Sequence, residues 1–130
     1  MSDRGFESLR LEKRGAVARV ALARAPVRNA FDDGLIAELT RAFGELARDA
    51  EVRVVVLSGD GPSFCAGADV AWMRKAGGYS QAENEADAKK MARMLRAIDA
   101  CPKPVVALAH GAAIGGGVGL VAAADIAIAA

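Results

Sequence analysis

The stretch best suited to chemistry runs from His110 to Leu120 and contains five glycines. Before it, residues 104–109 form an apolar run that predicts a buried strand, and after it residues 120–124 are small and favour a helix. Glycines at such a junction leave the first amides of the helix accessible, and those amides have no partner within the helix. Because free amides and the helix dipole favour an anionic oxygen, the stretch predicts a site that stabilises negative charge.

Two other interpretations of these glycines stay open. They could serve only the close packing of a helix. Residues 117–122 also fit the dinucleotide-binding pattern G-x-G-x-x-A. That pattern should open directly from a strand, however, and the chain stops before the acidic residue it needs about 20 positions later.

The β-branched run 52–57 predicts a central strand covered on both faces, which residues 58–62 end. A second loop of small residues, 63–69, follows it. The loop ends at Asp69, a good N-cap for a helix through Lys75. Adjacent parallel strands would bring both loops to one edge of the sheet, where ligands bind in α/β folds. One N–H group from each loop could then point at one oxygen, as in an oxyanion hole.

The elements around these loops follow an α/β order. Alternating residues between 6 and 22 predict a hairpin that turns at Gly15, followed by a loop over residues 24–30. Asp32 or Asp33 caps a helix through Arg48. Further on, the pattern predicts a long helix capped by Ser80 and ending near Ala100, and a strand that begins at Asp125. The buried face expected for the long helix consists of Ala86, Met91, Met94, Leu95 and Ile98.

Composition narrows the functional classes. Seventeen basic and 16 acidic residues give a net charge of +1, so there is no electrostatic case for nucleic acid or an anionic membrane. No apolar run reaches the length of a membrane span, and residues 1–5 lack the apolar core of a signal peptide. The two cysteines lack metal-ligand spacing, so no metal is expected, and they fit a reducing cytoplasm. One domain is expected at 130 residues.

Three motifs together resemble the enoyl-CoA hydratase/isomerase (crotonase) family: residues 24–31 (Arg-Ala-Pro-Val-Arg-Asn-Ala-Phe), 64–69 (Phe-Cys-Ala-Gly-Ala-Asp) and 111–117. The resemblance covers nearly the whole chain from about residue 6. It implies an α/β fold of the ClpP/crotonase type, a spiral of ββα units. Residues 1–130 would be the N-terminal part of a single domain, truncated before the C-terminal turns and helices. It also implies a homo-oligomer, a trimer or hexamer.

The resemblance further implies that the ligand is an acyl-CoA thioester, with coenzyme A as part of the substrate and no separate cofactor. By motif position, the catalytic groups are the backbone amides of Ala68 and Gly116, which would hold the thioester carbonyl and stabilise an enolate. The substrate and CoA contacts that it implies are Arg28, Ala66, Gly67, Asp69, Val70 and Trp72. For Trp72, plain core packing is an equal alternative.

The chain departs from the family pattern at its acid/base positions. Many hydratases of the family carry a glutamate where this chain has Gly119, and a second glutamate would lie beyond Ala130. The variant Gly-Gly-Gly-Val-Gly-Leu resembles the methylglutaconyl-CoA and isohexenylglutaconyl-CoA hydratases, which implies hydration of such a substrate by the complete protein. The alternative is a truncated, inactive fragment that binds CoA thioesters or oligomerises.

Other reactive side chains favour structural roles. Ser63 and His110 are local candidates for nucleophile and base, but no third group is evident, and a lone histidine is more often a hydrogen-bonded structural residue. Cys65 has no nearby base and is interpreted as a small packing residue. Arg74 and Lys75 could face a second substrate carboxylate, although a solvated helix face is the stronger interpretation.

Overall fold

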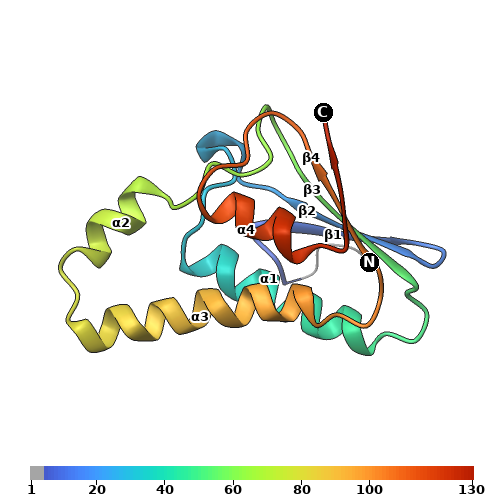
Figure 1. Cartoon of the computed structure of the whole chain (residues 1–130), viewed down its shortest axis with the longest axis horizontal. Coiled ribbons are helices and arrows are strands. Elements are labelled where there is room, and N and C mark those ends of the chain that lie inside the picture. The colour runs from blue at the N-terminus through green and yellow to red at the C-terminus, as the bar shows by residue number, and fades with distance from the viewer. Residues whose placement is uncertain (1–4) are drawn as a thin grey trace.

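Five strands form one sheet whose spatial order follows the chain, β1-β2-β3-β4-β5 (Figure 1). The computed structural model describes residues 5–130. The prediction for residues 1–5, which lack the apolar core of a signal peptide, therefore falls, except at Gly5, outside the described residues. The strands are β1 (Leu9–Arg14), β2 (Val17–Leu22), β3 (Val54–Gly59), β4 (Val105–Ala109) and β5 (Ile126–Ala129). The hairpin of β1 and β2 is antiparallel, as predicted, and every later pairing is parallel.

The helices are α1 (Asp33–Arg48), α2 (Val70–Ala76), α3 (Gln81–Asp99) and α4 (Gly116–Ala123), with a short 3₁₀ turn, η1, at Ala25–Val27. Figure 1 shows α1, α3 and α4 on one side of the sheet, whereas α2 and the first half of α3 extend away from it. Within residues 5–130, no helix combines the length and the hydrophobicity that crossing a bilayer requires.

The predicted caps begin three of these helices. The Asp32 carboxylate accepts a hydrogen bond from the N–H of Leu35, and Asp69 accepts bonds from the first turn of α2. Ser80 and Glu83 form a reciprocal capping box at the start of α3. Each such cap is worth about 1 kcal/mol, which explains why the helix starts were readable from the sequence.

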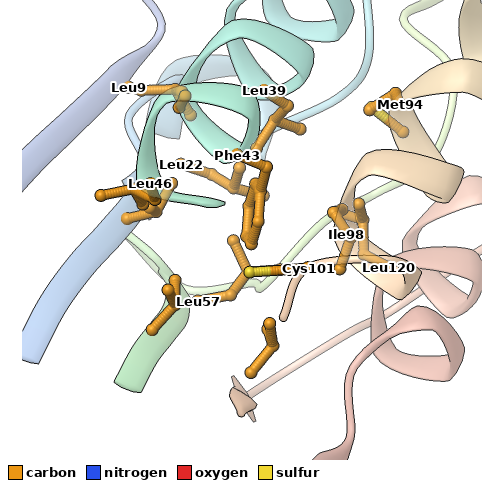
Figure 2. Close-up of a cluster of buried hydrophobic side chains, with 14 of the residues drawn as sticks. Leu9, Leu22, Leu39, Phe43, Leu46, Leu57, Met94, Ile98, Cys101 and Leu120 are labelled. Atoms are coloured by element: carbon orange, nitrogen blue, oxygen red, sulfur yellow. The ribbon is translucent and has the colours of Figure 1, made fainter. Parts of the chain in front are cut away.

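The core lies between one face of the sheet and helices α1, α3 and α4 (Figure 2). Phe43 of α1 and Cys101 lie at the centre of the drawn cluster, and Met94 and Ile98 reach it from α3. The largest side chains buried almost completely are Phe31, Phe43, Phe64, Leu9, Leu22, Leu35, Leu39, Leu57, Met94, Ile98, Leu120 and Val20. Full burial of one such side chain stabilises the fold by about 1.5–3 kcal/mol.

Three expectations about element boundaries and burial were wrong. Ala86, expected on the buried face of α3, is exposed because the first half of that helix extends away from the sheet. The central strand is covered on one face only: Val55 and Leu57 are fully buried, whereas Val54 and Val56 are half-buried, because all the covering helices lie on the other side. The helix after the glycine-rich stretch begins at Gly116, earlier than the small residues 120–124 indicated. Packing against neighbouring elements holds these glycines in a helix despite their low propensity.

Candidate functional site

The two predicted loops meet at one edge of the sheet, where the parallel strands β3 and β4 end. The N–H of Cys65 donates to the carbonyl of Ala112 at 3.1 Å, and the N–H of Ile114 donates back to the carbonyl of Cys65 at 3.0 Å. These bonds form an isolated parallel bridge between Cys65 and Ala113. The loops therefore form one backbone structure, as the α/β topology predicted.

Two glycines permit this close approach. Gly67 has a φ of +90°, and a Cβ atom at this position would lie 2.9 Å from the carbonyl oxygen of Ile114. A Cβ atom on Gly117 would lie 2.6 Å from the carbonyl oxygen of Cys65. Since both obstacles are backbone atoms that cannot move aside easily, only glycine fits either position.

Phe31 lies next to both predicted oxyanion donors, Ala68 and Gly116. Its N–H donates to the carbonyl of Gly67 at 2.7 Å, and its carbonyl accepts from the N–H of Asp69 at 2.8 Å. This bridge turns the N–H of Ala68, between them, away from Phe31. The Phe31 ring lies 2.7 Å from the position that a Cβ atom on Gly116 would take.

The amides of Ala68 and Gly116 both lack a backbone partner: within residues 5–130, neither N–H donates a hydrogen bond to a backbone carbonyl. Gly116 is the first residue of α4, where amides lack partners within the helix. Two free amides on contacting loops, one of them at a helix start, can stabilise an oxygen that gains negative charge.

A surface cavity of about 550 Å³ lies over the loop that contains Ala68. Its lining carries the positive charges of Arg28 and Arg74 and the carboxylate of Asp69 beside apolar walls. The predicted contact residues that line this cavity are Arg28, Ala66, Ala68, Asp69 and Val70.

Three other predicted residues lie outside the lining of that cavity. Gly67 is buried against the carbonyl of Ile114, and Gly116 lies between Phe31 and Met91. Trp72 lines a separate cavity of about 320 Å³. Its indole Nε1 donates to the carboxylate of Asp33 at 3.1 Å, and its ring packs against the core.

Arg24 connects the residues that frame the Ala68 loop. Its Nη2 atom lies 3.1 Å from Asp69 Oδ2 and 3.2 Å from Asp32 Oδ2, and its Nη1 donates to the carbonyl of Ala30. The pKa of Asp69 is lowered, first by the hydrogen bond from the N–H of Trp72 and then by the guanidinium of Arg24. The carboxylate that caps α2 is therefore held in its charged form next to Ala68.

Asn29 holds the same loop from behind. It is fully buried in a left-handed conformation with a φ of 58°. Its Nδ2 group donates to the carbonyls of Asp60, Ser63 and Phe64 at 2.8, 3.0 and 3.1 Å. Its Oδ1 accepts from the N–H of Arg24 at 2.8 Å. Residues 24–31 are recognisable in the sequence as a motif, but the contacts of Arg24 and Asn29 with the Ala68 loop are not, because those partners lie more than 30 residues away.

The other reactive side chains have structural partners. His110 Nε2 lies 2.6 Å from the carbonyl oxygen of Gly61, so the imidazole donates to the loop backbone. Cys65 is buried, its thiol donates to the carbonyl of Asn29 at 3.2 Å, and burial raises its pKa. In the described part of the chain, no three His, Cys, Asp or Glu side chains gather closely enough to hold a metal ion.

Comparison with known proteins gives consistent matches over this region. A family model described as enoyl-CoA hydratase/isomerase matches residues 12–130. A solved structure of an enoyl-CoA hydratase from Shewanella pealeana superimposes with a TM-score of 0.95 and 38% identity, over 98% of this chain and 48% of that one. This match confirms the predicted crotonase-like α/β fold.

Two curated relatives are mitochondrial Delta(3,5)-Delta(2,4)-dienoyl-CoA isomerases. The human protein is 38% identical over 95% of this chain and 40% of its own length. The Dictyostelium discoideum protein is 36% identical over 93% of this chain and 45% of its own. The chain thus spans less than half the length of the relatives that it matches. Their names contradict the expectation of a cytoplasmic protein, and they are isomerases rather than the methylglutaconyl-CoA hydratases that the glycine variant resembled.

Proposed function

Because the chain belongs to the enoyl-CoA hydratase/isomerase family, we propose that its two contacting loops bind the thioester of an unsaturated acyl-CoA and stabilise its enolate. The amides of Ala68 and Gly116 would donate to the thioester oxygen. Coenzyme A would enter only as part of the substrate. The observation that carries the proposal is the pair of unpaired amides on loops that hydrogen-bond to each other.

The charges around the site support an anionic ligand, because Asp69, the carboxylate in the lining of the cavity, already pairs with Arg24. Arg28 and Arg74 line the cavity beside Ala68, and guanidinium groups suit the phosphates of coenzyme A. The apolar part of the lining, which includes Val27 and Val70, suits the uncharged parts of the ligand. Loss of one oxyanion donor typically raises a barrier by about 3–4 kcal/mol, so each amide should matter to the reaction.

The finer reaction class depends on which group moves the proton. Gly119 offers no acid or base, although a side chain would fit there, since a Cβ atom would meet only Leu95 at ordinary contact distances. The names of the curated relatives favour migration of a double bond in a dienoyl-CoA. The glycine-rich variant favours hydration of a methylglutaconyl-type substrate. The contrasting proposal is a CoA-binding fragment without catalysis.

A carbonyl-labelled acyl-CoA would test the proposal directly. We expect the ¹³C resonance of the thioester carbonyl to shift downfield on binding to the full chain, because two amides polarise it. Ala68→Pro removes one donor and should reduce this shift. Gln81→Pro is the matched control, since Gln81 opens α3 at a position where proline is tolerated. An unshifted resonance in the bound complex would exclude the oxyanion hole.

Parallel assays separate the reaction classes. Incubation with a 3,5-dienoyl-CoA, crotonyl-CoA and methylglutaconyl-CoA, followed by absorbance and mass, distinguishes isomerisation, which keeps the mass, from hydration, which adds water. We expect the 130-residue chain not to hydrate crotonyl-CoA, because hydration needs two positioned acid/base groups and the Gly119 position supplies none. Hydration well above the uncatalysed rate would refute that expectation.

We also propose self-association. The open face of the sheet carries exposed apolar side chains on β2 and β5, namely Val17, Ile126 and Ile128. Such a surface tends to be covered by another polypeptide. Light scattering coupled to size exclusion would measure the mass of the particle, and a monomer at high concentration would oppose the proposal.

A further inference from the structure

One carboxylate on α3 stands apart from the other charges of that helix. Every residue from 81 to 90 is exposed except Asp87. Its Oδ2 atom is inaccessible to solvent and has no hydrogen-bond partner among residues 5–130. The Oδ2 atom of this half-buried residue is therefore an acceptor withdrawn from water and left unpaired.

The helical spacing places Asp87 on the face that meets the site. Asp87, Met91, Met94 and Ile98 follow one another at intervals of four, three and four residues, so they share one side of α3. Met94 and Ile98 are buried in the core. The Cε atom of Met91 lies 2.8 Å from the position of a Cβ atom on Gly116. Asp87 is thus one turn, about 6 Å of helix rise, from the residue that packs on a proposed oxyanion donor.

A structural role does not account for this side chain. A carboxylate oxygen that is shielded from water and lacks a hydrogen bond lowers the stability of the fold. Unpaired buried groups are rare in folded proteins, and those that persist often serve catalysis or meet a ligand. None of the ion pairs among residues 5–130 involves Asp87, so no lysine or arginine of the described chain pairs with it.

We propose that Asp87 is a catalytic carboxylate that moves a proton at the carbon chain of the bound acyl-CoA, an inference that rests on the proposed function. A lone pair of the carboxylate takes a proton from the saturated carbon next to the thioester carbonyl, or next to a double bond conjugated with it. The electrons of that C–H bond form the enolate, whose oxygen accepts from the amides of Ala68 and Gly116. Collapse of the enolate takes the proton back from Asp87. Return to the same carbon gives exchange, and delivery to another carbon of the conjugated enolate moves the double bond, with no other reactant consumed.

The step can be tested without turnover of the natural substrate. The full chain is incubated with butyryl-CoA in D₂O, exchange of the α-protons is followed by NMR, and binding is measured by calorimetry. We expect Asp87→Asn to slow exchange at least about 100-fold, in line with the contribution of a positioned base, while binding is retained. Asp99→Asn is the matched control, because Asp99 lies exposed at the end of the same helix.

Thermal unfolding separates catalysis from structure. Asp87→Asn removes an unpaired charge, so its melting temperature should not fall, and Asp87→Glu, which keeps a carboxylate, should restore part of the exchange. Native exchange in Asp87→Asn, or a variant that loses binding and stability together, would overturn the assignment. Binding of butyryl-CoA without exchange by the native chain would overturn the role of Asp87 alone. A native chain that binds no acyl-CoA would overturn the proposed function as well.

Discussion

Arg24 and Asp69 form a salt bridge, with 3.1 Å between Nη2 and Oδ2, across 45 residues of sequence. Arg24 follows β2, whereas Asp69 caps α2 and directly follows the proposed donor Ala68. The pair therefore joins the hairpin side of the sheet to the loop that carries the site. Its side chains are only 19% and 12% exposed, so solvent screens it less than a surface pair.

Arg24→Lys should weaken the contacts that hold the Ala68 loop in place, although the positive charge is kept. Lysine cannot reproduce the planar contacts to Asp69, Asp32 and the carbonyl of Ala30 at once. We expect the free energy of unfolding, measured in urea, to fall by about 1–2 kcal/mol. Arg19→Lys on the exposed side of β2 should stay within about 0.5 kcal/mol of the native chain. Equal effects of the two substitutions would contradict the framing role.

Asp69 should contribute to the loss of folding stability at low pH. Hydrogen bonds from the N–H of Trp72 and then the charge of Arg24 lower its pKa in the folded chain. A lowered pKa gives stability that is complete above the unfolded value of about 3.9 and is lost as pH falls through the folded value. We expect Asp69→Asn to be less stable at neutral pH and to lose less stability on acidification.

The informative quantity is the difference in unfolding free energy between the native chain and the Asp69→Asn variant at each pH. Asp49 and Glu83 also have lowered pKa values, through Lys13 and the Ser80 backbone respectively, and they titrate in the same acidic range. Their contributions are common to both chains and cancel. Parallel curves of unfolding free energy against pH would show that Asp69 is not stabilised in its charged form.

Gly116→Ala should destabilise the chain and impair acyl-CoA binding. The added methyl group would lie 2.7 Å from Phe31 Cε2 and 2.8 Å from Met91 Cε. Overpacking of this kind lowers stability by about 1–3 kcal/mol. Gly44→Ala in α1 is the matched control, because its nearest atom is Arg48 Nη1 at 3.9 Å. That change should stabilise the helix by about 0.5–1 kcal/mol, so the two substitutions differ in sign. A neutral Gly116→Ala would mean that this packing is loose.

Asn29→Asp is a nearly isosteric test of the buried amide. The substitution keeps the acceptor but replaces the Nδ2 donor with a charged oxygen that faces the carbonyls of Asp60, Ser63 and Phe64. We expect a loss of about 2 kcal/mol or more in chemical unfolding at neutral pH. Asn84→Asp, on the exposed first turns of α3, should change stability by less than about 0.5 kcal/mol. If both variants unfold at the same denaturant concentration, the Asn29 bonds are not essential.

Local patterns predicted much of the fold and the meeting of the two loops. Asp32, Asp69 and Ser80 cap helices because short polar side chains satisfy free amides in their own neighbourhood. The loops after β3 and β4 could be placed at one edge because parallel strands leave no other arrangement. A short local pattern was sufficient for the caps, and the order of strands and helices along the chain was sufficient for the loops.

Features that depend on distant partners were not predictable in this way. Nothing near Asn29 indicates that it binds the carbonyls of a loop 31 to 35 residues later. The early start of α4 at Gly116 depends on packing, since glycine alone disfavours a helix. In the sequence, Asp87 looks like one more charge on a polar helix, and only the burial of its oxygen sets it apart.

The sequential order of the strands bears on how the chain emerges from the ribosome. Each strand pairs with the one translated just before it, from β1 to β5. A nascent chain can therefore extend its sheet at a single growing edge, without reopening a pair already formed or waiting for a distant segment. The two loops are delivered in the same order, so the Ala68 loop can be in place before the ribosome releases the glycines that complete the site.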